Sequence, residues 1–509
     1  MAKNVVLIIL DGWGVGPQND ANVIYVAKPA IFEYLTENYP VTSLQASGIS
    51  VGLPWGETGN SEVGHLTLGA GKVIYQYYPK ITMAIQDRTF FENAALKSAF
   101  AHAKKNNSGI NLVGLLSQAN THASLGHLQA LIKMAEGEGV SNVKLHLFAD
   151  GLDSPPGSLL EILKKIPADK LASLTGRYYA MDRNQNWSLV QRAYDCMVGS
   201  GGAAASDLKA TLDSFYAKNQ SEEFLPPLRL GAEPIKDGDA VIFFNFREDS
   251  MRELLTAFAA KSFDKFPRPD FKNLHFVTLT KYKEDSAVLF AFPADAVEQP
   301  LGQILSEADK TQLRLAETYK YAHVTYFFNG YREPPAKKEY RVLVPSLNIT
   351  HPDEKPELMA SAVTDRLLEA VHNPGFDFIL VNYSNPDTIG HTGNYNACLE
   401  AVRVMDREVS RVVQAVEEAG TTLIITSDHG NIEQVISPIT GELESQHDSN
   451  PVPFHLIAPE FKGKKFPNWQ NMRNETLGIL SDVAPTILEL MELPPAPEMT
   501  GKSLLSHLI

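Results

Sequence analysis

Short runs of consecutive apolar residues recur along the chain, and longer segments with helical spacing lie between them. Runs that are apolar at every position, and not only at every second one, are typical of strands buried on both faces of a parallel sheet. The pattern predicts such strands at Val5–Leu10, Ile110–Leu116, Val143–Phe148, Ala240–Phe246, Leu274–Leu279, Phe376–Val381 and Thr422–Thr426.

The segments between the apolar runs predict amphipathic helices. Apolar residues three or four positions apart indicate helices at Ser124–Gly137, Asn396–Ala419 and Thr476–Met491. The small-residue segment Gly199–Ala205 is typical of a surface turn. Alternation of buried strands and helices predicts an α/β fold with a mostly parallel central sheet.

Charge and cysteine content narrow the choice of partner and compartment. The 509 residues include 45 Lys and Arg and 60 Asp and Glu, which gives a net charge of −15. An acidic surface disfavours nucleic acid and anionic membranes as partners. The two cysteines, Cys196 and Cys398, form no CxxC motif, and the first apolar run is too short to span a bilayer. We therefore expect a soluble cytoplasmic protein.

Acidic residues and histidines follow several of the predicted strands. In open α/β sheets, chemistry occurs beyond the carboxyl ends of the strands. One such residue alone is usually a helix cap or a buried polar residue, but the set together favours metal binding. Six ligands exceed the needs of one catalytic ion, so two metals are predicted. The candidate ligands are Asp11, Asp387, His391, Asp428, His429 and His447.

A glycine-rich segment, Gly52–Gly71, surrounds Ser61 and contains six glycines in twenty residues. Glycine lets a backbone approach a ligand closely, and a helix that begins near Ser61 would favour an anion at its N-terminus. A serine hydroxyl on a divalent metal is an activated nucleophile. Ser61 is therefore a candidate nucleophile, and the alternative is a simple helix cap.

A further group of residues suits an anionic substrate. Guanidinium groups bind phosphate or carboxylate in a bidentate manner, although most arginines are merely solvated. His122 and Asp153 are candidate acid–base groups, with a loop histidine and a helix-capping aspartate as the alternatives. The candidate anion-binding residues are Arg177, Arg183, Arg247 and Lys320.

Together these segments resemble the cofactor-independent (2,3-bisphosphoglycerate-independent) phosphoglycerate mutases of the alkaline phosphatase superfamily. The resemblance runs over nearly the full length of the chain. It rests on long and rare motifs, namely LDGWG, GLPxGxxGNSEVGH, GAGKVIYQ, SQANTHAS, GRYYAMDR, FNFR, LRLAETYKYAHVTYFFNG, NPDTIGHTG, SDHGN and HDSNPVPFHLIAP.

The resemblance implies two domains. An alkaline-phosphatase-like, metal-binding domain with a central mostly parallel sheet would comprise residues 1–75 and 299–509. A second α/β transferase domain, residues 76–298, would be inserted into it. The resemblance also implies a monomer.

The resemblance implies roles as well. Asp387, His391 and His447 would hold one Mn²⁺, and Asp11, Ser61, Asp428 and His429 would hold the other, with Mg²⁺ or Zn²⁺ not excluded by the donor types. Ser61 would accept the phosphoryl group of 3-phosphoglycerate and return it as 2-phosphoglycerate, so that no bisphosphoglycerate is required. Asp153 would move protons between the two hydroxyls of glycerate. The substrate would be held by His122, Asp153, Arg177, Arg183, Arg247 and Lys320.

Two positions depart from the family pattern. Leu152 stands where the family usually has an arginine in DGRD, and Ser250 stands where a second arginine follows FNFR. A hydrogen bond to a charged group contributes about 1.5–3 kcal/mol, so both losses would weaken substrate binding. Arg252 or another cation could substitute. Otherwise the chain is a phosphatase, or a mutase for another phosphorylated acid, or a metal-binding protein without activity.

Overall fold

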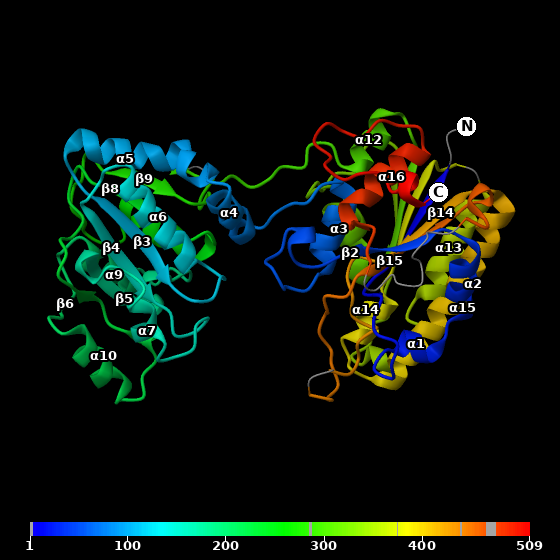
Figure 1. The fold of residues 1–509 in the computed structure, drawn as a ribbon, viewed down its shortest axis with the longest axis horizontal. Helices are drawn as coiled ribbons and strands as arrows, with labels where there is room; N and C mark the ends of the chain where they lie inside the picture. Colours follow the sequence, from blue (N-terminus) through cyan, green and yellow to red (C-terminus); the bar gives the residue numbers. More distant parts are fainter. Residues whose placement is uncertain (1–3, 285–287, 374, 438–439, 465–474, 509) are drawn as a thin grey trace. The chain divides into compact units, whose positions relative to one another are not determined.

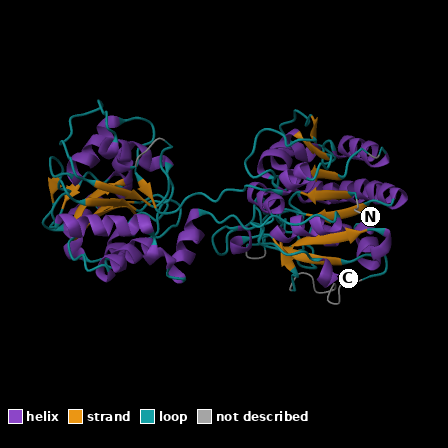
Figure 2. Cartoon of the chain, turned by 90° about the horizontal axis from the view of Figure 1, so that it is seen from above, coloured by secondary structure: helices purple, strands orange, loops and turns teal. Residues whose placement is uncertain are grey.

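The computed structural model describes residues 4–284, 288–373, 375–437, 440–464 and 475–508. The chain forms two compact units, Met1–Gln76 with Asp295–Ile509 and Tyr77–Ala294 (Figure 1). The sequence placed these boundaries after residues 75 and 298. Each unit contains an eight-stranded sheet with helices on both faces (Figure 2), which confirms the predicted α/β class. No helix within the described residues has the length and apolar character needed to cross a membrane.

The sheet of the first unit is parallel over its five leading strands. β15 then runs antiparallel to both of its neighbours, β14 and β2. Because parallel strands end at one edge of a sheet, residues that follow β11, β13, β1 and β14 meet there. The strand order is β12 (Glu339–Val344), β11 (Gln312–Glu317), β13 (Phe378–Tyr383), β1 (Val5–Leu10), β14 (Thr422–Thr426), β15 (Val452–Ile457), β2 (Val41–Gln45) and β16 (Gly478–Ile479).

The central strand β1 separates two hydrophobic cores. Val6, Ile8 and Leu10 belong to one core, while Val5, Leu7 and Ile9 belong to the other. Burial on both faces explains why the strand is apolar at every position. The first core includes residues of α2 (Ala30–Asn38), α13 (Ala360–His372) and α15 (Tyr395–Ala419), and the second includes residues of α3 (Ser61–Ala70), α12 (Leu301–Glu307) and α16 (Val483–Leu490) (Figure 1).

The second unit repeats this design with its own core. All neighbouring strands are parallel except the β5–β7 pair. Helices that contribute to the core include α5 (Ala94–Asn106), α6 (Leu125–Gly137) and α9 (Trp187–Met197). The strand order is β10 (Leu289–Phe290), β9 (His275–Thr278), β8 (Ala240–Phe243), β3 (Ile110–Leu116), β4 (Val143–Ala149), β5 (Leu171–Gly176), β7 (Leu228–Arg229) and β6 (Ala203–Ala204).

Some predicted elements need correction. The predicted helix Thr476–Met491 is wrong in its first half, where the chain forms β16 and a short 3-10 turn before α16 begins at Val483. Pro485 then lies in the first turn of α16, where its missing N–H costs no helical hydrogen bond. Strands such as β11 and β15 escaped prediction because polar residues interrupt them, namely the buried Arg314 and His455.

Candidate active site

In the first unit, the predicted metal ligands converge at the carboxyl edge of the sheet. Asp11 follows β1, and Asp428 and His429 lie just beyond β14. Asp387 lies in the first turn of α14 (Asn385–Gly390), directly after β13. All four residues are buried. The parallel arrangement therefore brings together side chains that are hundreds of residues apart in sequence.

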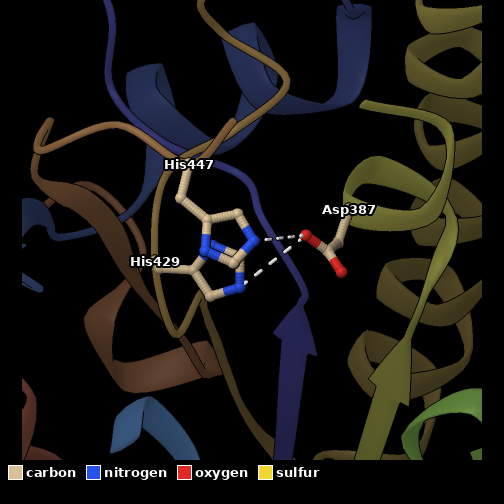
Figure 3. A group of neighbouring side chains, drawn as sticks. All are labelled: Asp387, His429 and His447. Carbon is tan, nitrogen blue, oxygen red and sulfur yellow. Dashed lines mark ion pairs between the residues drawn. The ribbon is translucent and has the colours of Figure 1, made fainter. Parts of the chain in front are cut away.

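One group of candidate ligands forms around Asp387. Figure 3 shows the imidazoles of His429 and His447 turned toward the Asp387 carboxylate. Asp387 Oδ1 lies 3.2 Å from His447 Nε2 and 3.8 Å from His429 Nε2. His391 Nε2 is 3.2 Å from the same oxygen and 3.0 Å from His447 Nε2. The three residues that the resemblance assigns to one metal are thus neighbours.

A second group forms around Ser61. The Ser61 Oγ lies 3.0 Å from Asp11 Oδ1 and 3.0 Å from His429 Nε2. His429 Nε2 is also 3.7 Å from Asp428 Oδ2. Ser61 is the first residue of α3, and the Asn60 side chain caps that helix by accepting a hydrogen bond from Val63 N–H. The cap fixes where the helix begins and hence where Ser61 lies.

Backbone carbonyl groups orient the histidines. Nδ1 of His447 lies 2.8 Å from Gly59 O, and Nδ1 of His391 lies 2.9 Å from Ser445 O. His429 Nδ1 is 3.1 Å from its neighbouring carbonyl, Gly430 O. Each contact engages Nδ1 and leaves Nε2 for the carboxylate cluster. This arrangement around metal-binding histidines fixes the ring tautomer and orientation.

Lys320 lies inside the same cluster, in the first unit. Its Nζ is 2.6 Å from Asp11 Oδ1, 2.6 Å from Asp387 Oδ2 and 2.7 Å from Ser61 Oγ. Burial alone would raise the pKa of Asp11 and of Asp387, but the Lys320 charge contributes to an opposing effect that lowers both. Burial disfavours the charged His429 ring, yet Asp428 and the other carboxylates raise its pKa to about 10.

The donor set fits divalent metal ions. Three carboxylates, three imidazoles and one hydroxyl are the mixed oxygen and nitrogen ligands that Mn²⁺, Mg²⁺ and Zn²⁺ accept. Two subsets have ligand atoms within 4.8 Å of one another: Asp387, His429 and His447, and Asp11, Asp428 and His429. Among the described groups, none donates a well-aligned hydrogen bond to the buried Asp428 Oδ2, since the neighbouring His65 Nδ1 also lies 2.8 Å from Ser61 O; this oxygen is available as a ligand.

The sequence analysis missed the residues that support these ligands. His65 Nδ1 lies 3.0 Å from Asp428 Oδ2. Asn382 Nδ2 donates to Asp11 Oδ2 at 2.7 Å, and Asn431 Nδ2 donates to Asp387 Oδ1 at 3.0 Å. Asn382 follows a predicted strand, and that position could have marked it. Nothing local distinguishes His65 from an ordinary helical histidine.

The other predicted residues lie in the second unit, around a cavity of about 560 Å³. The segments that supply them follow β3, β4, β5 and β8, again at the carboxyl ends of parallel strands. The cavity is lined by all five of the remaining candidates and by both departures from the family pattern. These lining residues are His122, Asp153, Arg177, Arg183 and Arg247, with Leu152 and Ser250.

Carboxylates hold the arginines of this cavity. Arg177 Nη1 donates to Asp150 Oδ1 and to Asp153 Oδ2, each at 2.7 Å. Burial opposes the charge on Arg177, but hydrogen bonds to these carboxylates outweigh it and raise the pKa. Arg183 and Arg247 share Asp249. Arg183 Nη1 lies 2.8 Å from Asp249 Oδ2, and Arg247 Nε lies 3.2 Å from Asp249 Oδ1. These two cations exceed the charge of the one carboxylate that they share, while Asp182 and Glu223 also line the cavity.

His122 lies between Ser250 and the acid–base candidate Asp153. Its Nδ1 is 3.2 Å from Ser250 Oγ, and its Nε2 is 3.9 Å from Asp153 Oδ2. Burial, followed by the charge of Arg177, lowers the pKa of His122. The imidazole is therefore neutral near pH 7.

Arg252 does not replace the missing arginines in this structure. Its Nε donates to Tyr282 O at 3.0 Å, and its Nη2 donates to Glu248 Oε1 at 3.3 Å. It is absent from the described lining of the cavity. Where the resemblance implies arginines, position 250 has a hydroxyl that contacts His122 and position 152 has an apolar side chain.

The α/β fold and the cluster of carboxylates and histidines together define a metalloenzyme. Residues 3–495 match the model of the Metalloenzyme superfamily. The chain is 42% identical to a 2,3-bisphosphoglycerate-independent phosphoglycerate mutase of Ectopseudomonas mendocina, covering 99% of this chain and 98% of the relative. It is 43% identical to the protein of that name from Thermomicrobium roseum, covering 98% of both chains.

A solved structure gives a similar result. A phosphoglycerate mutase of Leishmania mexicana, crystallised at low cobalt concentration, has a TM-score of 0.54 and 25% identity, covering 99% of this chain and 97% of the other. The chain belongs to the 2,3-bisphosphoglycerate-independent phosphoglycerate mutase family. It is accordingly an enzyme of the isomerase class that depends on divalent metal.

Proposed function

We propose that this protein interconverts 3-phosphoglycerate and 2-phosphoglycerate through a phosphoserine at Ser61. One observation carries the proposal. The Ser61 hydroxyl lies 3.0 Å from both Asp11 and His429, which belong to one candidate metal group. A hydroxyl in such surroundings is a nucleophile and not merely a helix cap.

The proposal includes two Mn²⁺ ions, and the same donor set also suits Mg²⁺ or Zn²⁺. Asp387, His391 and His447 would hold one ion, and Asp11, Ser61, Asp428 and His429 would hold the other. When bound, the two cations would lower the pKa of the Ser61 hydroxyl and neutralise phosphoryl charge.

The protein's own groups perform the transfer. Ser61 attacks as the alkoxide, its proton having passed to solvent, and the alkoxide is restored at the end of the cycle. As the Ser61 Oγ–phosphorus bond forms, the bond from phosphorus to O3 of the substrate breaks and glycerate is left. The O2 hydroxyl of glycerate then attacks phosphorus, and the bond to Ser61 breaks. Lys320, 2.7 Å from Ser61 Oγ, balances negative charge at the hydroxyl. Because Ser61 stores the phosphoryl group, no bisphosphoglycerate is needed.

The second unit recognises the acid. Arg183 and Arg247 carry the net positive charge that a carboxylate needs. Asp153 gives a proton to O3 as the bond from phosphorus to O3 breaks, and then takes the proton of the O2 hydroxyl as that oxygen attacks phosphorus, with neutral His122 hydrogen-bonding to the glycerate oxygens. Arg177 holds Asp153 through its 2.7 Å hydrogen bond. We propose further that the enzyme acts as a monomer in the cytoplasm, with no nucleic-acid or membrane partner.

Phosphorus NMR with Mn²⁺ and 3-phosphoglycerate tests this function. The wild type should form 2-phosphoglycerate, and Ser61→Ala should not. Ser206→Ala, which alters an exposed serine of the second unit, is the matched control and should behave like the wild type. Release of inorganic phosphate instead would establish a phosphatase. Unchanged 3-phosphoglycerate with the wild type would reject this substrate.

A further inference from the structure

The cavity of the second unit has an apolar wall. Three of its lining residues are large hydrophobic side chains that remain exposed: Leu152 at 65%, Tyr178 at 47% and Phe224 at 44%. Exposed apolar side chains gathered in one hollow mark a ligand-binding surface more often than scattered ones do. Leu152 is also one of the two departures from the family pattern.

Side-chain contacts connect the segments that carry the three residues of this apolar wall. The Ser221 hydroxyl donates to Gly151 O at 3.1 Å, which ties the loop before Leu152 to the turn that carries Phe224. Gly151 has a φ of +69°, a conformation that favours glycine and sets the direction of the loop. The rings of Tyr178 and Phe224 are 5.1 Å apart. The wall is therefore built by tertiary contacts between three separate segments: the loop with Leu152, α8 (Arg177–Ala180) with Tyr178, and the 3-10 turn with Phe224.

Charge is unevenly distributed around the cavity. Arg177 is matched by two carboxylates, Asp150 and Asp153, so it leaves no positive excess near Leu152. Arg183 and Arg247 contact one carboxylate in common, Asp249, and the described lining of the cavity also includes Asp182 and Glu223. A ligand that suits this cavity carries one anionic group for the two arginines and an apolar group for the wall.

We propose that Leu152, Tyr178 and Phe224 form a subsite for an alkyl substituent on the carbon chain of the phosphorylated acid. The proposal rests on the proposed mutase function and widens its substrate class. The enzyme would accept phosphorylated 2,3-dihydroxy acids with a methyl or larger group on C3, in addition to phosphoglycerate. Leu152 is the specificity-determining residue, because an arginine there would place a charge in the alkyl subsite.

The cavity has room for this substituent. Its volume of about 560 Å³ lies within the range of small-molecule sites. Burying one methyl group against an apolar wall strengthens binding about fourfold. An arginine at position 152 would reverse this preference, since it favours an anion and leaves its own charge partly desolvated beside an alkyl group.

The test compares two substrates on three proteins. The substrates are 3-phosphoglycerate and its homologue with a methyl group on C3, 2,3-dihydroxybutanoate 3-phosphate. The proteins are the wild type, Leu152→Arg and Leu289→Arg. Leu289 is another exposed leucine of the second unit, and it does not line the cavity in the described structure. The readout is the ratio of kcat/KM for the homologue to that for 3-phosphoglycerate.

We expect the wild type to use the homologue about fourfold better, through a lower KM. Leu152→Arg should lower the ratio about tenfold or more, and Leu289→Arg should leave it unchanged. Calorimetric binding of both phosphorylated acids to the Ser61→Ala protein should show the same preference without turnover. Loss of that preference on adding Leu152→Arg would support the subsite independently of catalysis.

The results that reject the alkyl subsite differ from those that reject the mutase function. If the wild type converts 3-phosphoglycerate but Leu152→Arg leaves the ratio and the calorimetric preference unchanged, the alkyl subsite is rejected and the mutase function stands. If the wild type forms no 2-phosphoglycerate, the proposed function is rejected. Equal binding of the two acids to Ser61→Ala would then reject the subsite as well.

Discussion

Lys320 shows how the surroundings of one residue decide its role. From sequence it was an expected substrate contact, and the structure places its amine among Asp11, Asp387 and Ser61. Its side chain is 8% exposed, so solvent screens these ion pairs little. The amine balances charge that bound metal would otherwise have to balance alone.

Removing this amine should make the fold depend on metal. Without metal, Lys320→Met leaves two buried carboxylates without their cation, which should lower the free energy of unfolding by about 3–5 kcal/mol. Added Mn²⁺ should recover much of the loss, because metal binds the folded state and stabilises it. Urea unfolding with and without Mn²⁺ measures both effects.

The exposed pair between Lys209 and Asp213 provides the control. Lys209→Met should leave the unfolding midpoint and its response to Mn²⁺ unchanged, because exposed ion pairs contribute little. Equal stability of Lys320→Met and the wild type in metal-free buffer would contradict the role given to Lys320.

Local sequence indicated the candidate ligands but not the residues that support them. Asp11, Asp428 and His429 could be predicted because each follows a recognisable apolar strand. His65 and Asp150, which holds Arg177, could not, since their partners are distant in sequence. Ser250 likewise gave no local sign of its contact with His122.

At the scale of elements, strands β3, β4 and β5 carry a buried polar ladder. On β4, His146 Nδ1 lies 2.9 Å from Ser173 Oγ, and His146 Nε2 lies 3.2 Å from Asn111 Oδ1. Burial, assisted by the Lys144 charge, lowers the pKa of His146 to about 3. The apolar pattern predicted β3 and β4, but it could not show that their polar residues pair inside the sheet.

This histidine should make the second unit sensitive to acid. Between its ordinary pKa of 6.5 and its folded value of about 3, the unfolded chain binds one proton more than the folded chain. The free energy of unfolding contributed by His146 is therefore lost as pH falls, by about 1.4 kcal/mol per pH unit. Urea unfolding at about pH 7 and about pH 5 should show a smaller loss for His146→Gln than for the wild type. An identical loss would refute this assignment.

At the scale of the whole molecule, the two units differ in which stretches of the chain form them. Tyr77–Ala294 is continuous and contains its own sheet and core. The other unit needs both ends of the chain, because β1 pairs with β13 on one side and β14 on the other.

The continuous unit should therefore fold alone. We expect residues 77–294 expressed by themselves to unfold cooperatively in urea and to show dispersed amide NMR signals. Residues 1–76 alone should do neither, because their central strand lacks both partners. A fragment 77–294 without a cooperative transition would show that its core is insufficient.

By itself the sequence determined the α/β class, the buried strands and the residues at their ends, because strand burial and helix packing impose periods that are visible in a local window. It also contained the motifs from which the family was inferred, and the comparisons confirmed that family. Only the tertiary structure decided which polar groups meet. Gly12 N–H donates to Asp428 across 416 residues, and Leu152 shares one cavity with Tyr178 and Phe224. Contacts of this kind depend on strand order and loop packing, which no local pattern records.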